Sequence, residues 1–239
     1  MFWWYGDDHS SAHDAEFDDL FRRYVRNAYR RLQLPVPDEL FVSNISAAAA
    51  AAVQTEPTTL LAPTLDGEET SYFEWLGAGT LEIRAVAGAM HQTDRRPAVV
   101  SLVHFGFDHE HLYVRVDSAS RVDDVLADGR EISLKFFTPG GVRFSVRQRL
   151  GRLTASFWYR QVTEPYWVDR GPGGATVAAG TVLELAVPFA DLGLGADQPV
   201  AFFVAVFDDA GAELERHPAH RPIELLTPDA LFEARHWRA

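Results

Sequence analysis

The sequence predicts a mainly β protein, an antiparallel β-sandwich preceded by a short α-helical segment. After residue 63, apolar and polar residues alternate in many short runs that glycine and proline separate. Before residue 43, the apolar residues recur instead with the period of a helix. The 239 residues are 47% hydrophobic and 23% charged, a composition that supplies enough apolar surface for a sizeable core.

The first element is an amphipathic helix expected from Asp14 to Leu32. Its apolar side chains follow the i, i+3, i+4, i+7 spacing and share one face: Phe17, Leu20, Phe21, Tyr24, Val25, Ala28, Tyr29 and Leu32. Acidic residues crowd its first turns and arginines its last turns, which complements the helix dipole. Pro35 and Pro37 end it, and a short second helix is expected over Asp38–Val42. The aromatic stripe needs a partner surface, either the rest of this chain or another protein.

The rest of the chain divides into a connector and the β domain. Residues 1–42 form the helical segment, residues 43–62 are expected to be a linker, and residues 63–239 the β-sandwich. Strands are expected at 81–84, 98–107, 112–117, 131–137, 142–146, 153–160, 176–178, 182–187, 200–207, 213–216 and 223–225. One helical turn is expected over Pro188–Leu192.

Charge and composition exclude several classes of partner. The net charge of −12 argues against nucleic acid and against an anionic membrane surface, because both require clustered lysine or arginine. The absence of cysteine excludes disulfides and thiolate metal sites. No basic start leads into an apolar signal core, and no apolar run approaches the ~20 residues that span a bilayer. We therefore expect a cytoplasmic protein.

Catalytic and metal-binding motifs are weak. There is no Gly-x-Ser-x-Gly motif and no phosphate-binding loop, and no pair stands out among the 34 acidic residues as a glycosidase site. His9 and His13 are either half of a zinc site or a polar helix entry, and the second interpretation is favoured because the helix is expected to begin after His9. The histidines around the turn at 108–111 are more simply solvated, and Asp123-Asp124 lacks an oxygen-rich calcium motif. We expect no metal and no cofactor.

Tryptophans are the best candidates for ligand contact. An exposed indole ring stacks on the apolar face of a pyranose while polar neighbours bind its hydroxyl groups. Trp75, Trp158 and Trp167 are the candidates, with core packing as the competing interpretation for each.

Several segments carry a family resemblance. The residues Phe2-Trp3-Trp4-Tyr5-Gly6-Asp7-Asp8-His9-Ser10-Ser11, with 14–22 after them, resemble the end of the catalytic region of glycoside hydrolase family 57, the α-amylase/amylopullulanase-like enzymes. The segments 63–67, 70–79 and 88–91 resemble the region that follows in many members, and 183–192 is similar to the β-sandwich of family 9 carbohydrate-binding modules. The resemblance implies that Trp3 and Trp4 border the active-site region, where they contact substrate or pack a helix bundle.

The function implied by this resemblance is accessory. The family's catalytic Glu and Asp lie on barrel strands upstream of the matched region, so we expect no hydrolysis by this chain alone. It would support a catalytic glycoside hydrolase domain, bind α-glucan or another carbohydrate, or do both. The alternative is a structural module that docks onto a separate partner through its N-terminal helix. A glycan binder should expose at least two coplanar rings on one face, whereas a docking module should expose an apolar patch along Phe17, Phe21 and Tyr24.

Overall fold

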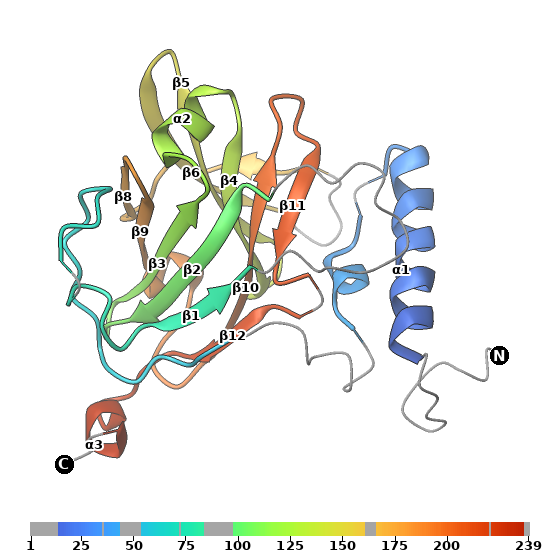
Figure 1. Cartoon of the computed structure of the whole chain (residues 1–239). Coiled ribbons are helices and arrows are strands. Elements are labelled where there is room, and N and C mark those ends of the chain that lie inside the picture. The colour runs from blue at the N-terminus through green and yellow to red at the C-terminus, as the bar shows by residue number, and fades with distance from the viewer. Residues whose placement is uncertain are drawn as a thin grey trace.

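A computed structural model of the chain describes residues 14–34, 36–43, 54–71, 73–83, 98–160, 166–219 and 221–236. In this part of the chain the protein is mainly β, with two antiparallel sheets and few helices (Figure 1). None of the described helices has both the length and the apolar character needed to cross a membrane.

The first sheet has five strands in the order β1-β2-β3-β9-β8. Their bounds are β1 Gly79–Glu82, β2 Val100–Phe107, β3 His111–Ser118, β8 Thr176–Ala179 and β9 Leu183–Pro188. The β2–β3 hairpin turns at the 108–111 segment, as the alternating pattern predicts.

The second sheet has seven strands in the order β11-β10-β4-β5-β6-β7, and β12 also pairs with β10. Their bounds are β4 Glu131–Thr138, β5 Val142–Arg149, β6 Arg152–Tyr159, β7 Val168–Asp169, β10 Pro199–Phe207, β11 Glu213–His217 and β12 Ile223–Leu226. All of these pairings are antiparallel.

The core lies between the two sheets. On β4, Ile132, Leu134 and Phe136 are buried and face it, and Phe105 of β2 meets Phe202 of β10 edge to face at 6.4 Å. Burying such side chains contributes about 1.5–3 kcal/mol each. Because strand residues alternate between faces, the intervening polar residues of each strand lie on the outer face of its sheet.

The helices are α1 Asp14–Arg31, η1 Asp38–Phe41, α2 Val122–Ala127, η3 Phe189–Leu192 and α3 Phe232–His236. The long first helix, the short second one and the single turn after β9 agree with the sequence prediction. The short helices α2 and α3 and the two-residue strand β7 were not expected, because elements of this length carry too few residues to establish a period.

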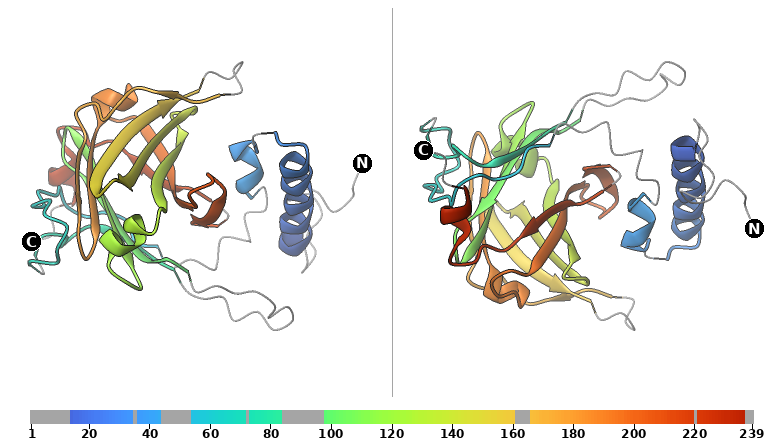
Figure 2. Two further views of the ribbon diagram at one scale, coloured as in Figure 1. Left: turned by 90° about the horizontal axis from the view of Figure 1, so that it is seen from above. Right: turned by 90° about the horizontal axis from the view of Figure 1, so that it is seen from below.

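The N-terminal helical segment sits against the outer face of the seven-stranded sheet, with η1 between α1 and the sheet (Figure 2). Asp38 of η1 pairs with Lys135 of β4 at 3.0 Å and with Arg216 of β11 at 3.4 Å. The guanidinium carbon of Arg216 lies 3.4 Å from the centroid of the Phe41 ring. These contacts with the second sheet are made by η1, and the aromatic stripe of α1 takes no part in them.

The predicted linker is only partly a connector. Within 54–62, the Thr55 N–H donates to the Thr80 carbonyl at 2.9 Å, and the Leu61 N–H donates to the Phe107 carbonyl at 2.9 Å. Leu61 is also buried. These residues lie along β1 and β2 because their backbone groups and one apolar side chain find partners there. Residues 54–61 of the predicted linker therefore pair with the first sheet, and residues 44–53 lie outside the described residues.

Candidate functional site

Trp75 lies on the outer face of the five-stranded sheet, but its side chain is buried there. Its side chain is only 6% exposed, and its Nε1–H donates to the Glu184 carboxylate at 3.1 Å. The same fully buried carboxylate accepts the backbone N–H groups of Asp66 and Gly67 at 3.0 and 2.9 Å. Gly67 has φ +79°, and a Cβ there would come within 2.7 Å of the Ala179 backbone. Trp75 is thus an anchor for the covering segment, and this placement disfavours a ligand-binding role.

Trp158 and Trp167 come together on the outer face of the seven-stranded sheet. Trp158 belongs to β6 and stands opposite Arg143 of β5 in the strand register, while Trp167 immediately precedes β7. The Arg143 guanidinium carbon lies 5.4 Å from the Trp158 ring centroid and 5.3 Å from that of Trp167. Arg160 lies 5.0 Å from the Trp167 ring. We call Arg143, Trp158, Arg160 and Trp167 the aromatic–arginine cluster.

Strand alternation places this cluster outside. Phe144 and Phe157 pair across β5 and β6, with ring centroids 4.7 Å apart, and both are buried in the core. Their neighbours Arg143 and Trp158 must then face outward, because a shift of one residue would place a guanidinium in the core.

Two buried N–H groups of the cluster lack acceptors. Among the residues that the structure describes, neither Trp158 Nε1 nor Arg143 Nε has a hydrogen-bond partner. Leaving such a donor unsatisfied costs about 1–3 kcal/mol. Burial lowers the pKa of Arg143, and the charges of Asp38 and Glu213 oppose that effect. The cluster therefore contains a desolvated cation and two buried donors that lack acceptors among the described residues.

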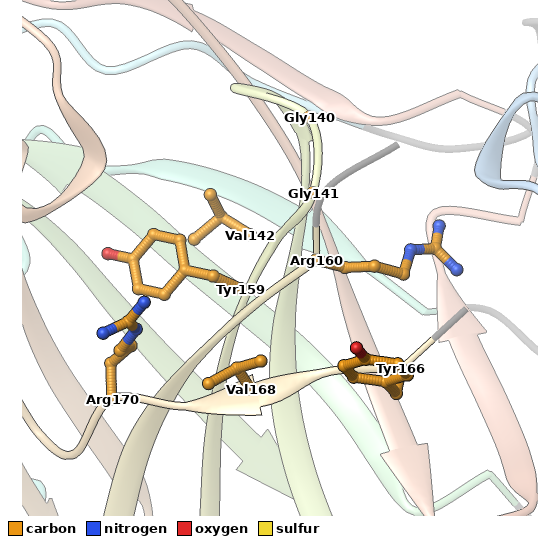
Figure 3. Close-up of a pocket in the computed structure, with 8 residues that line it drawn as sticks. All are labelled: Gly140, Gly141, Val142, Tyr159, Arg160, Tyr166, Val168 and Arg170. Atoms are coloured by element: carbon orange, nitrogen blue, oxygen red, sulfur yellow. The ribbon is translucent and has the colours of Figure 1, made fainter. Parts of the chain in front are cut away.

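A cleft of about 730 Å³ borders the cluster beside β6 and β7 (Figure 3). It is lined by Gly140, Gly141, Val142, Tyr159, Arg160, Tyr166, Val168 and Arg170. Arg160 and Tyr166 lie toward one side of the view, and Tyr159 and Arg170 toward the other. Tyr166 is 60% exposed, whereas the Tyr159 hydroxyl is held by a 2.7 Å bond to the Asp191 carbonyl.

A second cleft, of about 270 Å³, lies along the β5–β6 hairpin. Its lining is mostly polar: Ser145, Arg147, Arg149, Thr154, Ala155, Ser156, Trp158 and Asp169. Trp158 therefore belongs both to the cluster and to this cleft. Together the two clefts place hydroxyl and guanidinium groups on both sides of the paired tryptophans, an arrangement suited to a polar ring ligand.

The histidines proposed as alternative metal ligands do not gather. His104 Nε2 lies 4.0 Å from Asp117, and His111 Nδ1 lies 3.3 Å from Asp108. In the described part of the chain, no group of three or more His, Asp or Glu side chains could hold a metal ion. Asp123 pairs instead with Arg121 at 3.0 Å.

Some sequence candidates lie outside the described residues, and some site residues were not anticipated. Trp3, Trp4, His9 and His13 belong to the first group. Sequence reasoning missed the arginines of β5, although the segment 142–149 alternates apolar residues with Arg143, Ser145, Arg147 and Arg149. That alternation, extended across the whole strand, would have placed three arginines on one face.

Comparisons with protein-family models, with curated proteins and with solved structures found no match to this chain. Its function must therefore be argued from the chemistry of the site and from the motifs of the sequence.

Proposed function

We propose that the chain is the non-catalytic accessory β-sandwich of a family 57-like, α-glucan-acting glycoside hydrolase, and that it binds glucan at the aromatic–arginine cluster. The observation that supports binding is the pairing of Trp158 and Trp167 about one guanidinium, on one face of a sheet and between two polar clefts. The family assignment depends on the segments that carry the resemblance: 2–11 with 14–22, 63–67, 70–79, 88–91 and 183–192.

The chemistry of the site suits a saccharide. A pyranose offers axial C–H groups to an indole face and hydroxyl groups to surrounding donors and acceptors. Here the exposed Tyr166 ring lies next to Trp167 in sequence, and Arg160 and Arg170 line the same cleft. Trp158 lies on β6, which pairs with β5 on one side and with β7 on the other. Little conformational entropy is therefore lost when its ring contacts a ligand.

Calorimetric titration with maltoheptaose, a linear α-1,4-gluco-oligosaccharide, tests this proposal. We expect saturable binding that weakens at least about tenfold when either Trp158 or Trp167 is changed to Ala, as for a central aromatic contact. Tyr24→Ala removes an exposed aromatic ring from α1 and is the control, which should bind as the parent does.

No heat of binding at millimolar sugar would overturn the carbohydrate proposal. So would binding that survives both tryptophan changes, because the sugar would then sit elsewhere. Circular dichroism on each variant shows whether the fold is intact, and Trp158→Phe retains an aromatic ring should Trp158→Ala fail to fold.

A second candidate function, docking onto a separate catalytic domain, is favoured by the orientation of α1. The helix buries the ion pair of Asp18 and Arg22, and Asp18 also accepts a 2.9 Å hydrogen bond from Ser43. Its apolar residues Leu20 and Tyr24 are instead 42% and 68% exposed. Charged groups inside and apolar groups outside reverse the usual polarity of a surface helix.

Docking is tested by sedimentation of the chain mixed with a family 57-type catalytic domain. A complex that weakens in the Leu20→Ala/Tyr24→Ala variant, but not in Trp167→Ala, would support docking through α1. If no complex forms at tens of micromolar protein, docking is overturned and glucan binding stands on its own test.

A further inference from the structure

The outer face of the β5–β6 hairpin is unusually basic for a chain of net charge −12. Residues that pair across an antiparallel hairpin share a face, and every second pair lies on the same side. The outer pairs are Arg143 with Trp158, Ser145 with Ser156, Arg147 with Thr154, and Arg149 with Arg152. Four arginines, three hydroxyl groups and one indole thus occupy a single stripe.

The acidic residues near this stripe do not balance it. The buried carboxylate of Glu131 pairs with Arg147 and lies 3.9 Å from Arg143. Among the described residues, no carboxylate forms an ion pair with Arg149, whose side chain is exposed. Asp169 is the one acidic residue that lines the cleft of about 270 Å³. Among the residues that line the cleft, two arginines are therefore accompanied by one carboxylate.

The two arginines of the cleft repel each other. Burial lowers the pKa of Arg147, and the neighbouring charge of Arg149 lowers it further. Two like charges held on one face of a strand are unfavourable unless an anion lies between or beside them. Arg147 pairs with Glu131, whereas Arg149 pairs with no carboxylate among the described residues and is open to an anion from solution.

The neighbouring aromatic–arginine cluster also contains N–H groups that lack hydrogen-bond acceptors. Trp158 lines this cleft, and its buried Nε1–H lacks an acceptor among the described residues, as does the Nε–H of the adjacent Arg143. Sulfate, phosphate and carboxylate groups are strong acceptors that also carry a negative charge to pair with Arg149, whereas a hydroxyl group supplies only a neutral acceptor.

We propose that this site prefers a saccharide that carries an acidic group, whose sulfate, phosphate or carboxylate binds in the β5–β6 cleft at Arg149 and Arg147 while a sugar ring contacts Trp158. This inference rests on the proposed carbohydrate binding and adds the chemical class of the ligand. The cleft is large enough for one oxyanion substituent and part of the ring that carries it.

The test compares four probes by calorimetric titration: maltoheptaose, sulfated maltoheptaose, an oligogalacturonate of the same length, and inorganic sulfate. At least one acidic oligosaccharide should bind about tenfold or more tightly than maltoheptaose, since hydrogen bonds to charged groups are the stronger ones. Comparing the sulfate ester with the carboxylate identifies which oxyanion fits. Raising the salt concentration should reduce this advantage, because the cleft is open to solvent.

The diagnostic variant is Arg149→Gln. Arg149 is exposed, whereas removing Arg147 would leave the buried Glu131 without its partner and endanger the fold. Arg149→Gln should lose most of the acidic advantage, so that the affinities for acidic and neutral oligosaccharide become similar. Arg235→Gln removes the same charge from α3, which lies at the opposite end of the molecule from the β5–β6 hairpin (Figure 1), and should change neither affinity.

The other possible outcomes distinguish a failure of this inference from a failure of the proposed carbohydrate binding. Equal affinity for neutral and acidic oligosaccharides, or an acidic advantage that survives Arg149→Gln, overturns the inference and leaves glucan binding in place. Inorganic sulfate that binds as tightly as sulfated maltoheptaose overturns the role of the sugar ring. Acidic binding that is unaffected by Trp158→Ala overturns the proposed carbohydrate site itself.

Discussion

The outer faces of the two sheets carry the same kinds of side chain, a tryptophan beside charged groups, but differ in how those groups are satisfied. On the five-stranded sheet, Trp75 donates to Glu184, and Glu184 accepts three N–H groups in all. On the seven-stranded sheet, Trp158 and Arg143 stack against each other, yet each retains a buried N–H without an acceptor in the described part of the chain.

This difference distinguishes an anchor from a candidate site. On the five-stranded sheet the chain itself supplies the partner of each of these polar groups. The tryptophan there holds a covering segment in place, and no polar group beside it needs a ligand. Where partners are missing and a cleft adjoins the ring, a ligand or water must complete the arrangement. The two faces therefore predict opposite mutational results, on stability for the first and on binding for the second.

Trp75→Ala should have the largest effect on stability. The change removes a buried ring and one hydrogen bond and leaves a cavity under the segment 66–77, so the free energy of unfolding should fall by about 3–5 kcal/mol. Urea denaturation followed by circular dichroism measures it. Tyr24→Ala, an exposed aromatic residue, should change stability by less than about 0.5 kcal/mol. A loss below 1 kcal/mol for Trp75→Ala would contradict the anchor assignment.

Glu184→Gln should have the second-largest effect on stability. The amide keeps the shape and one carbonyl acceptor, but it places an NH₂ group against N–H donors and loses charge-assisted hydrogen bonds, at about 2 kcal/mol. Hydrogen exchange of the Asp66 and Gly67 amides should accelerate with it, whereas exchange in the β5–β6 hairpin should not. Acceleration in both places would mean that the two outer faces are coupled.

Sequence periodicity was sufficient for the longer strands and insufficient for the chemistry of these two outer faces. The runs at 131–137 and 200–207 alternate or are apolar over enough residues to identify two strands of the seven-stranded sheet. Nothing local to Trp75 shows that Glu184, 109 residues away, accepts its N–H. Both Trp75 and Trp158 were therefore equal candidates in the sequence, and only the tertiary contacts separate them.

The acid response of the contact between η1 and the seven-stranded sheet should be smaller. Burial raises the pKa of Asp38 and of Glu213, but the charges and hydrogen bonds of Lys135 and Arg216 outweigh it, so both pKa values lie below their ordinary 3.8 and 4.5. Groups with lowered folded-state pKa values stabilise fully above the ordinary value and lose that contribution as the pH falls below it. The contact of η1 with the sheet should thus weaken below about pH 4.5, by roughly 1 kcal/mol.

Hydrogen exchange of the η1 amides across pH 3–6, corrected for intrinsic rates, measures this weakening. Asp38→Asn should lower protection at pH 6 and flatten the pH profile, since it removes one of the two titrating partners. An unchanged profile in Asp38→Asn would place the acid-sensitive group elsewhere.

Arg143→Lys should have the smallest effect on stability and is the sharpest test of the contrast between the faces. Lysine keeps the positive charge but lacks the planar guanidinium that lies over both rings, so unfolding should become easier by only about 0.5–1 kcal/mol. If the cluster is a binding site, the affinity for oligosaccharide should fall more steeply than stability, because the relative positions of Trp158 and Trp167 depend on that plane. If stability falls by several kcal/mol while affinity is unchanged, Arg143 is an anchor of the same kind as Glu184, and the two faces no longer differ in kind.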